Sequence, residues 1–262
     1  MASEHPFQSR RTLYRAALQI AERSFHRLAG QVPPPQEVPW GDLGFFYRYT
    51  ERLPEQALVL KLARQVSGLF AVDTLLFHGL VQEQGVIQRT LDEIGEDIFC
   101  LAVGLQEGFE PLHRQLLDAF WEEEFNNPRS ATKSTQKRAP PPRRKVHAYL
   151  ARFGGGDVSG AQEVNRTISK AYSGYVHAAA PHVMDIYGGQ PPHFYVSGVA
   201  GTSRQADHID DAQNYFYRGL LSVIIVARAF GDAETNSQVG EFVTGFEKEC
   251  GMDFTRERKL QR

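Results

Sequence analysis

The chain has 262 residues, of which 42% are hydrophobic and 23% are charged, and its formal net charge is −2. This composition is typical of a folded globular protein that is long enough to bury a large core. The near-neutral charge excludes a general attraction to nucleic acid or to an anionic membrane, so such binding needs a local patch. The two cysteines, Cys100 and Cys250, are far apart and without CxxC spacing. This arrangement favours two reduced, buried thiols over a zinc finger or a disulfide framework.

The N-terminus is polar and lacks the apolar segment of a secretory signal. The most apolar stretch, residues 220–227, is far shorter than the roughly 20 residues that span a bilayer. We therefore expect a cytoplasmic protein that has no membrane partner.

Apolar residues recur at helical spacing along most of the chain, which predicts an all-α helical bundle. In the stretch that begins at Pro54, apolar residues step by three and four up to a break at Gly79, and a second long helix then continues to about Val103. Two long helices joined by a short break predict an antiparallel hairpin, the usual unit of a bundle. Further helices are expected at 9–29, 111–125, 159–187, 205–230 and 236–250, all within a single domain over residues 1–262.

Three segments rich in proline, glycine or small polar residues predict loops. Residues 30–54 should form a long loop that Phe45, Phe46 and Tyr47 pin to the body. Residues 126–145 are basic and rich in Pro and Ser, which predicts a mobile loop, either a solvated linker or a nucleic-acid patch. The lack of interleaved aromatic residues favours the linker. A small β-hairpin is expected near 190–202.

The segment 166–177 combines residues that favour phosphate chemistry. Arg166, Lys170, Ser173 and His177 are separated by four, three and four positions, which places them on one helix face. A cationic face of this kind favours phosphate binding, with His177 as the proton donor or acceptor. The alternative is a solvated helix face, or a histidine hydrogen-bonded within the bundle.

A second polar face carries Gln82, Arg89, Glu93 and Glu96 on the helix after Gly79. Arg89 and Glu93 are spaced to pair along the helix, and two interpretations stay open: a structural clamp, which local spacing favours, or part of a site.

Two further stretches contain residues that can bind metals, and each of them has a simpler interpretation. The segment 207–211 should open an apolar helix, where its aspartates complement the helix dipole. Glu110 and His113 have the spacing of one di-iron ligand pair, but no second copy exists. The P-loop, dinucleotide-binding, nucleophile-elbow and zinc-helix motifs are also missing, so no metal or cofactor is expected.

Two stretches carry a family resemblance, the segments 85–102 (GVIQRTLDEIGEDIFCLA) and 170–181 (KAYSGYVHAAAP). Together they resemble the DUF5677 type of bacterial all-helical proteins, which is similar to HEPN domains. Arg89 and Glu93 match one family segment, and Tyr172, Ser173 and His177 match the other.

The resemblance implies a component of a bacterial defence or toxin system that acts on RNA or nucleotides, as a homo-oligomer or with a protein partner. In this hypothesis His177 transfers the proton, Ser173 lies beside it, and Glu93 orients the cations. Substrate contacts would come from Arg89, Arg166, Lys170 and Tyr172. His177 follows Lys170 at the spacing of the HEPN Arg…His motif, but lysine cannot make the bidentate phosphate contact of arginine. A non-catalytic interaction protein with buried polar clamps is therefore the competing hypothesis.

Overall fold

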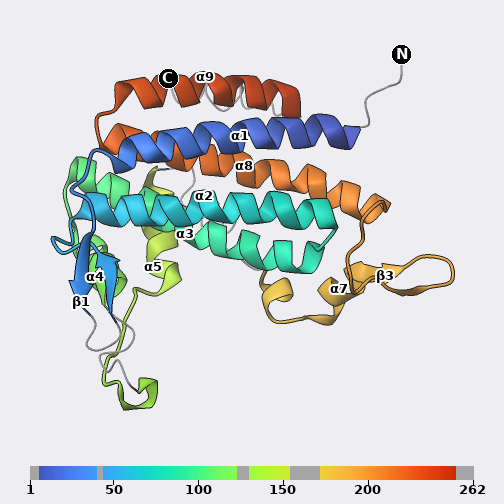
Figure 1. Ribbon diagram of the computed structural model, residues 1–262, viewed down its shortest axis with the longest axis horizontal. Coiled ribbons are helices and arrows are strands. Elements are labelled where there is room, and N and C mark those ends of the chain that lie inside the picture. Colours follow the sequence, from blue (N-terminus) through green and yellow to red (C-terminus); the bar gives the residue numbers. More distant parts are fainter. Residues whose placement is uncertain (1–5, 40–43, 123–129, 154–171, 252–262) are drawn as a thin grey trace.

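A computed structural model describes residues 6–39, 44–122, 130–153 and 172–251 of the chain. Its body is a bundle of long helices packed side by side, as Figure 1 shows, which confirms the predicted all-α fold with antiparallel hairpins. The long helices are α1 (Pro6–Ala29), α2 (Pro54–His78), α3 (Val81–Glu107), α8 (Ser203–Ala229) and α9 (Ala233–Cys250).

The break between α2 and α3 lies at the predicted glycine. Gly79 has a φ of 69°, the left-handed conformation that glycine adopts without strain, and its N–H closes the last turn of α2. Its carbonyl also accepts a hydrogen bond from the N–H of Val199 (2.9 Å). A Cβ at this position would collide with the backbone of Val199 and Ala200, so the hairpin needs glycine for two reasons.

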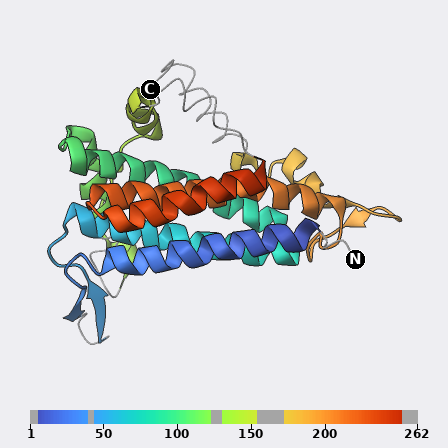
Figure 2. The same ribbon diagram turned by 90° about the horizontal axis from the view of Figure 1, so that it is seen from above.

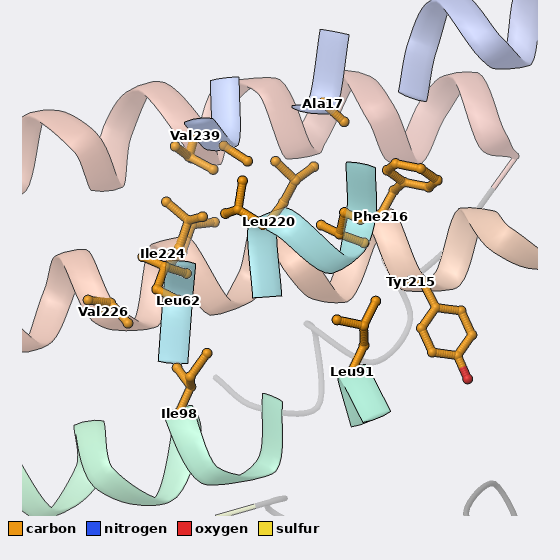
Figure 3. Packing of buried hydrophobic residues seen from close by; sticks show 14 of the residues in the cluster. Ala17, Leu62, Leu91, Ile98, Tyr215, Phe216, Leu220, Ile224, Val226 and Val239 are labelled. Atoms are coloured by element: carbon orange, nitrogen blue, oxygen red, sulfur yellow. The ribbon is translucent and has the colours of Figure 1, made fainter. Parts of the chain in front are cut away.

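Helix α8 is the centre of the core and packs against α1, α2, α3 and α9. Figure 3 shows its residues Phe216 and Leu220 among apolar side chains from the surrounding helices. Tyr14 of α1 stacks on Phe216 with ring centroids 4.2 Å apart, and its hydroxyl donates to the carbonyl of Ile209 (2.6 Å). The buried stripe predicted for α2 is confirmed, since its apolar residues Leu58, Leu62, Val66, Leu69, Val72 and Leu76 are all buried.

Shorter elements lie around the bundle (Figures 1 and 2). They are β1 (Gln36–Pro39), β2 (Phe45–Arg48), α4 (Pro111–Trp121), η2 (Ala131–Lys133), α5 (Arg143–Leu150), η3 (Ala151–Phe153), α7 (Ala180–Val183), η4 (Met184–Ile186), β3 (Tyr187–Gly188) and β4 (His193–Phe194). Strands β1 and β2 pair antiparallel, and so do β3 and β4.

The structure corrects three predictions about loops. Residues 30–54 contain the β1–β2 hairpin, and Phe45 and Tyr47 are more than half exposed instead of pinning this segment to the core. The second hairpin spans 187–194, earlier than the predicted 190–202. Helix α5 begins at Arg143, inside the segment 126–145, because this arginine finds carboxylate partners on α3.

Two predictions about helices also change. Helix α8 begins at Ser203 with Thr202 as its N-cap, so the aspartates of 207–211 lie in its second and third turns, and the dipole explanation for them fails. In the segment predicted as one helix over 159–187, residues 172–176 are helical and the chain turns before α7, in which Pro181 lies in the first turn. Cys100 and Cys250 are free thiols, the first buried and the second half-buried. No helix in the described ranges is long and apolar enough to cross a membrane.

Asp232 caps α9 and ties it to α1. Its Oδ1 accepts from the N–H of Thr235 (3.0 Å), and its Oδ2 accepts from Arg27 Nε (2.8 Å) and Gln31 Nε2 (2.6 Å). The hydrogen bond from Arg27 is the main reason why the pKa of Asp232 lies at about 2. The carboxylate is therefore stabilised in the folded state relative to the unfolded chain.

We predict that Asp232→Asn lowers the melting temperature by a few degrees at pH 7 and has little effect at pH 2. Asparagine can still accept from the N–H of Thr235 as an N-cap, but its amide nitrogen, like a protonated carboxyl, faces the donors Arg27 and Gln31 instead of accepting from them. The folded-state pKa is depressed, so this stability is present above the unfolded pKa of about 3.9 and disappears as the pH falls toward 2. Thermal unfolding across this pH range measures it, and a constant difference between variant and wild type would contradict the prediction.

Candidate functional site

The helical residues 172–176 pack across α3 and α8. The ring of Tyr175 lies directly against Gly85 of α3, where a Cβ would come within 2.6 Å of it. Gln82 Nε2, one turn earlier on α3, donates to the carbonyl of His182 (2.7 Å). The ring of Tyr172 meets Tyr215 of α8 edge-on, with centroids 5.5 Å apart. The two sequence segments singled out by their polar residues therefore belong to neighbouring elements.

The individual side chains of the predicted site are brought together only in part. Arg89 and Glu93 form the predicted pair along α3, with Nη2 and Oε1 2.7 Å apart, but Glu93 is 41% exposed, so the pair is not a buried clamp. His177 is exposed, and Ser173 is half-buried. Within the described ranges, no hydrogen bond or ion pair joins Arg89 or Glu93 to either of them. The predicted phosphate contacts Arg166 and Lys170 lie outside the described residues.

Asp92, one turn after Gln88 on the inner side of α3, forms the buried centre of this region. It is 3% exposed and pairs with Arg218 of α8, whose Nη1 lies 2.5 Å from Oδ1. Its Oδ2 accepts a hydrogen bond from the hydroxyl of Tyr215 (3.3 Å). Burial raises the pKa of Asp92 above its usual value, although Arg218 and Tyr215 oppose that shift.

A second set of ion pairs continues along α3. Asp97 is held by Lys61 of α2 (2.8 Å) and by Arg143 of α5 (2.7 Å). Glu96 accepts from His147 Nε2 (3.0 Å) and lies 3.4 Å from Arg143. Burial raises the pKa of Glu96, while His147 and Arg143 lower it. A carboxyl group with a raised pKa that contacts an imidazole occurs in acid–base sites as well as in structural networks.

A cavity of about 200 Å³ opens between α2, α3, α5 and α8, beside both carboxylates. Its polar wall comprises Gln65, Asp92, Glu96, Arg218 and Ser222, and its apolar wall comprises Leu91, Phe99, Leu150, Leu221 and Ile225. A pocket of this size fits a ligand that is smaller than a typical drug molecule.

A neighbouring cavity of about 350 Å³ lies under the helical residues 172–176. There the hydroxyl of Tyr175 donates to Asp185 (2.8 Å), and burial lowers the pKa of His208. Tyr172 lines this cavity and Tyr215 lines the first one, so the contact between their rings separates the two.

Glu110 and His113, the predicted metal-ligand spacing, have a structural role. The Nδ1 atom of buried His113 accepts a hydrogen bond from the N–H of Glu110 (2.9 Å), which closes the first turn of α4. In the part of the chain that the structure describes, no cluster of His, Cys, Asp and Glu has metal-binding geometry.

Comparison with known proteins does not identify this site: no family model, no curated protein and no solved structure matches the chain. The central residues Asp92, Tyr215 and Arg218 were not among the sequence candidates, and Glu96 was noted only as part of a polar face. The available signal for Asp97 was its spacing of three and four residues before the buried Cys100 and Leu101, which places it on their face of the helix. The same spacing links Asp92 only to polar residues and a glycine, so nothing in the sequence marked it.

We predict that Asp97→Ala lowers the free energy of unfolding by about 3–5 kcal/mol, because it leaves Lys61 and Arg143 without their closest carboxylate in a buried place. The double variant Lys61→Met/Asp97→Leu should lose clearly less free energy of unfolding than the sum of the losses in the single variants Lys61→Met and Asp97→Leu. Urea unfolding measures both. The control is Asp210→Ala, which removes an exposed ion pair with Arg10 and should cost under about 1 kcal/mol. Additive losses at positions 61 and 97 would show that the two charges are not coupled.

Proposed function

We propose that this chain is a HEPN-like helical component of a bacterial defence or toxin system that cleaves RNA, with His177 as its proton-transfer residue. The observation that carries the proposal is the packing of Tyr175 on Gly85. It places the two segments that resemble the family on neighbouring elements, although they are far apart in the sequence.

The exposed position of His177 suits a surface site for a large substrate, while the Arg89 side chain is only 19% exposed. Arg89 lies one helical turn after Gly85, so it projects from the side of α3 on which the helical residues 172–176 pack. His177 is exposed just beyond these residues, and its N–H is held by the carbonyl of Ser173 (3.1 Å). An RNA strand reaches an exposed imidazole without entering the bundle.

The chemistry that fits such a histidine is cleavage by the neighbouring 2′-hydroxyl. The hydroxyl oxygen bonds to phosphorus while the bond from phosphorus to the 5′-oxygen breaks, which yields a 2′,3′-cyclic phosphate and a 5′-hydroxyl end. In this proposal His177 accepts the proton of the attacking 2′-hydroxyl, and the departing 5′-oxygen takes a proton from water to become the 5′-hydroxyl. Arg89, and Lys170 and Arg166 in the preceding segment, would contact the phosphate, while Glu93 orients Arg89 and Tyr172 stacks on a base.

The competing function, a non-catalytic interaction protein, would use the same bundle without the chemistry. Buried clamps at Arg89–Glu93 and Ser173–His177 are not its basis, since Glu93 is only half-buried and His177 is exposed. The buried ion pairs around Asp97 are a structural network that serves either function.

We predict that the wild-type protein cleaves total cellular RNA and arrests growth on expression, and that His177→Ala reduces cleavage by about 10²–10⁴-fold, the usual contribution of a general acid or base. The matched control is His26→Ala, which removes another exposed histidine, on α1. This control should cleave RNA like the wild type, and both variants should have the melting temperature of the wild type. An inert wild type, or equal activity in all three proteins, would overturn the proposal and favour the interaction protein.

A further inference from the structure

The cavity between α2, α3, α5 and α8 contains a polar group whose position the fold does not explain. Gln65 is 3% exposed and lines the cavity, yet its buried Oε1 atom makes no hydrogen bond with any residue in the described ranges. Burying an amide without a partner costs free energy that an apolar side chain of the same shape would avoid. A ligand that pairs with this amide accounts for glutamine at this position.

Arg218 supplies the complementary group on the opposite helix. Its Nη1 is engaged by Asp92, while Nε and Nη2 form no hydrogen bond or ion pair with a described residue. The side chain is 39% exposed, at the mouth of the cavity. The wall therefore presents an amide whose oxygen is unpaired and a guanidinium that still has donors.

The remaining wall selects the type of ligand. Asp92 and Glu96 line the same cavity, so a phosphate or carboxylate group inside it would be repelled. Phe99 and Leu221 offer flat and apolar surfaces on which an uncharged ring can pack. The volume of about 200 Å³ limits the ligand to one small ring system.

We infer that this cavity binds a nucleobase, with its edge paired to Gln65 and Arg218 and its ring packed against Phe99 and Leu221. Adjacent N–H donors and acceptors are the feature of a base edge that glutamine and arginine side chains recognise in pairs. The site is distinct from His177, and the inference does not rest on the proposed RNA cleavage.

Two substitutions test the cavity without breaking the ion pairs. Gly95 lies on its wall, where a Cβ would stand 3.9 Å from Ser222 Oγ and 4.0 Å from Gln65 Nε2, which is ordinary contact. Gly95→Ala therefore narrows the cavity while it raises the helix propensity of α3. Gln65→Leu keeps the shape of the side chain approximately and removes the amide. Gly240→Ala on α9, where nothing lies within 4 Å of the new Cβ, is the matched control.

The experiment measures binding of adenine and cytosine to the full chain by calorimetry and saturation-transfer NMR, with indole as a ring that lacks the donor–acceptor edge. We expect both bases to bind, indole to bind more weakly, and Gln65→Leu to weaken base binding by about tenfold or more. Gly95→Ala should also weaken it while melting no earlier than the wild type, and Gly240→Ala should leave it unchanged.

Three results would overturn the inference: no binding of either base, equal binding of indole and the bases, or base binding that neither cavity variant changes. His177→Ala separates this site from the proposed nuclease. It should bind adenine like the wild type, so base binding without RNA cleavage, or the reverse, shows which of the two proposals fails.

Discussion

The arrangement of the bundle depends on carboxylates that α3 turns toward the protein interior. Asp92 and Asp97 are buried on this helix and Glu96 is mostly buried next to Asp97, in places where an unpaired charge is strongly unfavourable. Their cationic partners come from three other helices: Lys61 from α2, Arg143 and His147 from α5, and Arg218 from α8. Each ion pair forms only when the two helices pack in one register, so the carboxylates specify how these helices pack against α3. This specificity does not depend on how much net stability the pairs contribute.

The same constraint creates the polar cavity. Apolar side chains fill the space between α1, α2 and α8, as Figure 3 shows around Leu220, whereas the charged groups of α3 and α8 leave room beside them. The pKa values of Asp92 and Glu96, which line this cavity, are raised because burial outweighs the attraction of their cationic partners. The network around Asp97 is structural, and the part around Asp92 faces a space in which a ligand can lie.

The proposed nuclease surface and the proposed base cavity use different sides of one contact. Tyr172 packs on Tyr215, and Tyr215 holds Asp92, so the helical residues 172–176 are tied to the buried charges as well as to Gly85. His177 lies at the exposed end of this arrangement and Gln65 at the buried end.

The sequence by itself determined the long helices of the bundle, because their apolar residues repeat at helical spacing whatever the surroundings. The stripe from Leu58 to Leu76, the glycine between α2 and α3, and the pairing of Arg89 with Glu93 all follow from local geometry. The tertiary structure alone decided which polar residues meet. Arg143 lies in a basic segment that is typical of a loop, and it becomes helical because Asp97 is near it in space. Arg218 and Asp92 are separated by more than a hundred residues, and neither spacing nor composition links them, since their attraction exists only after α3 and α8 have packed.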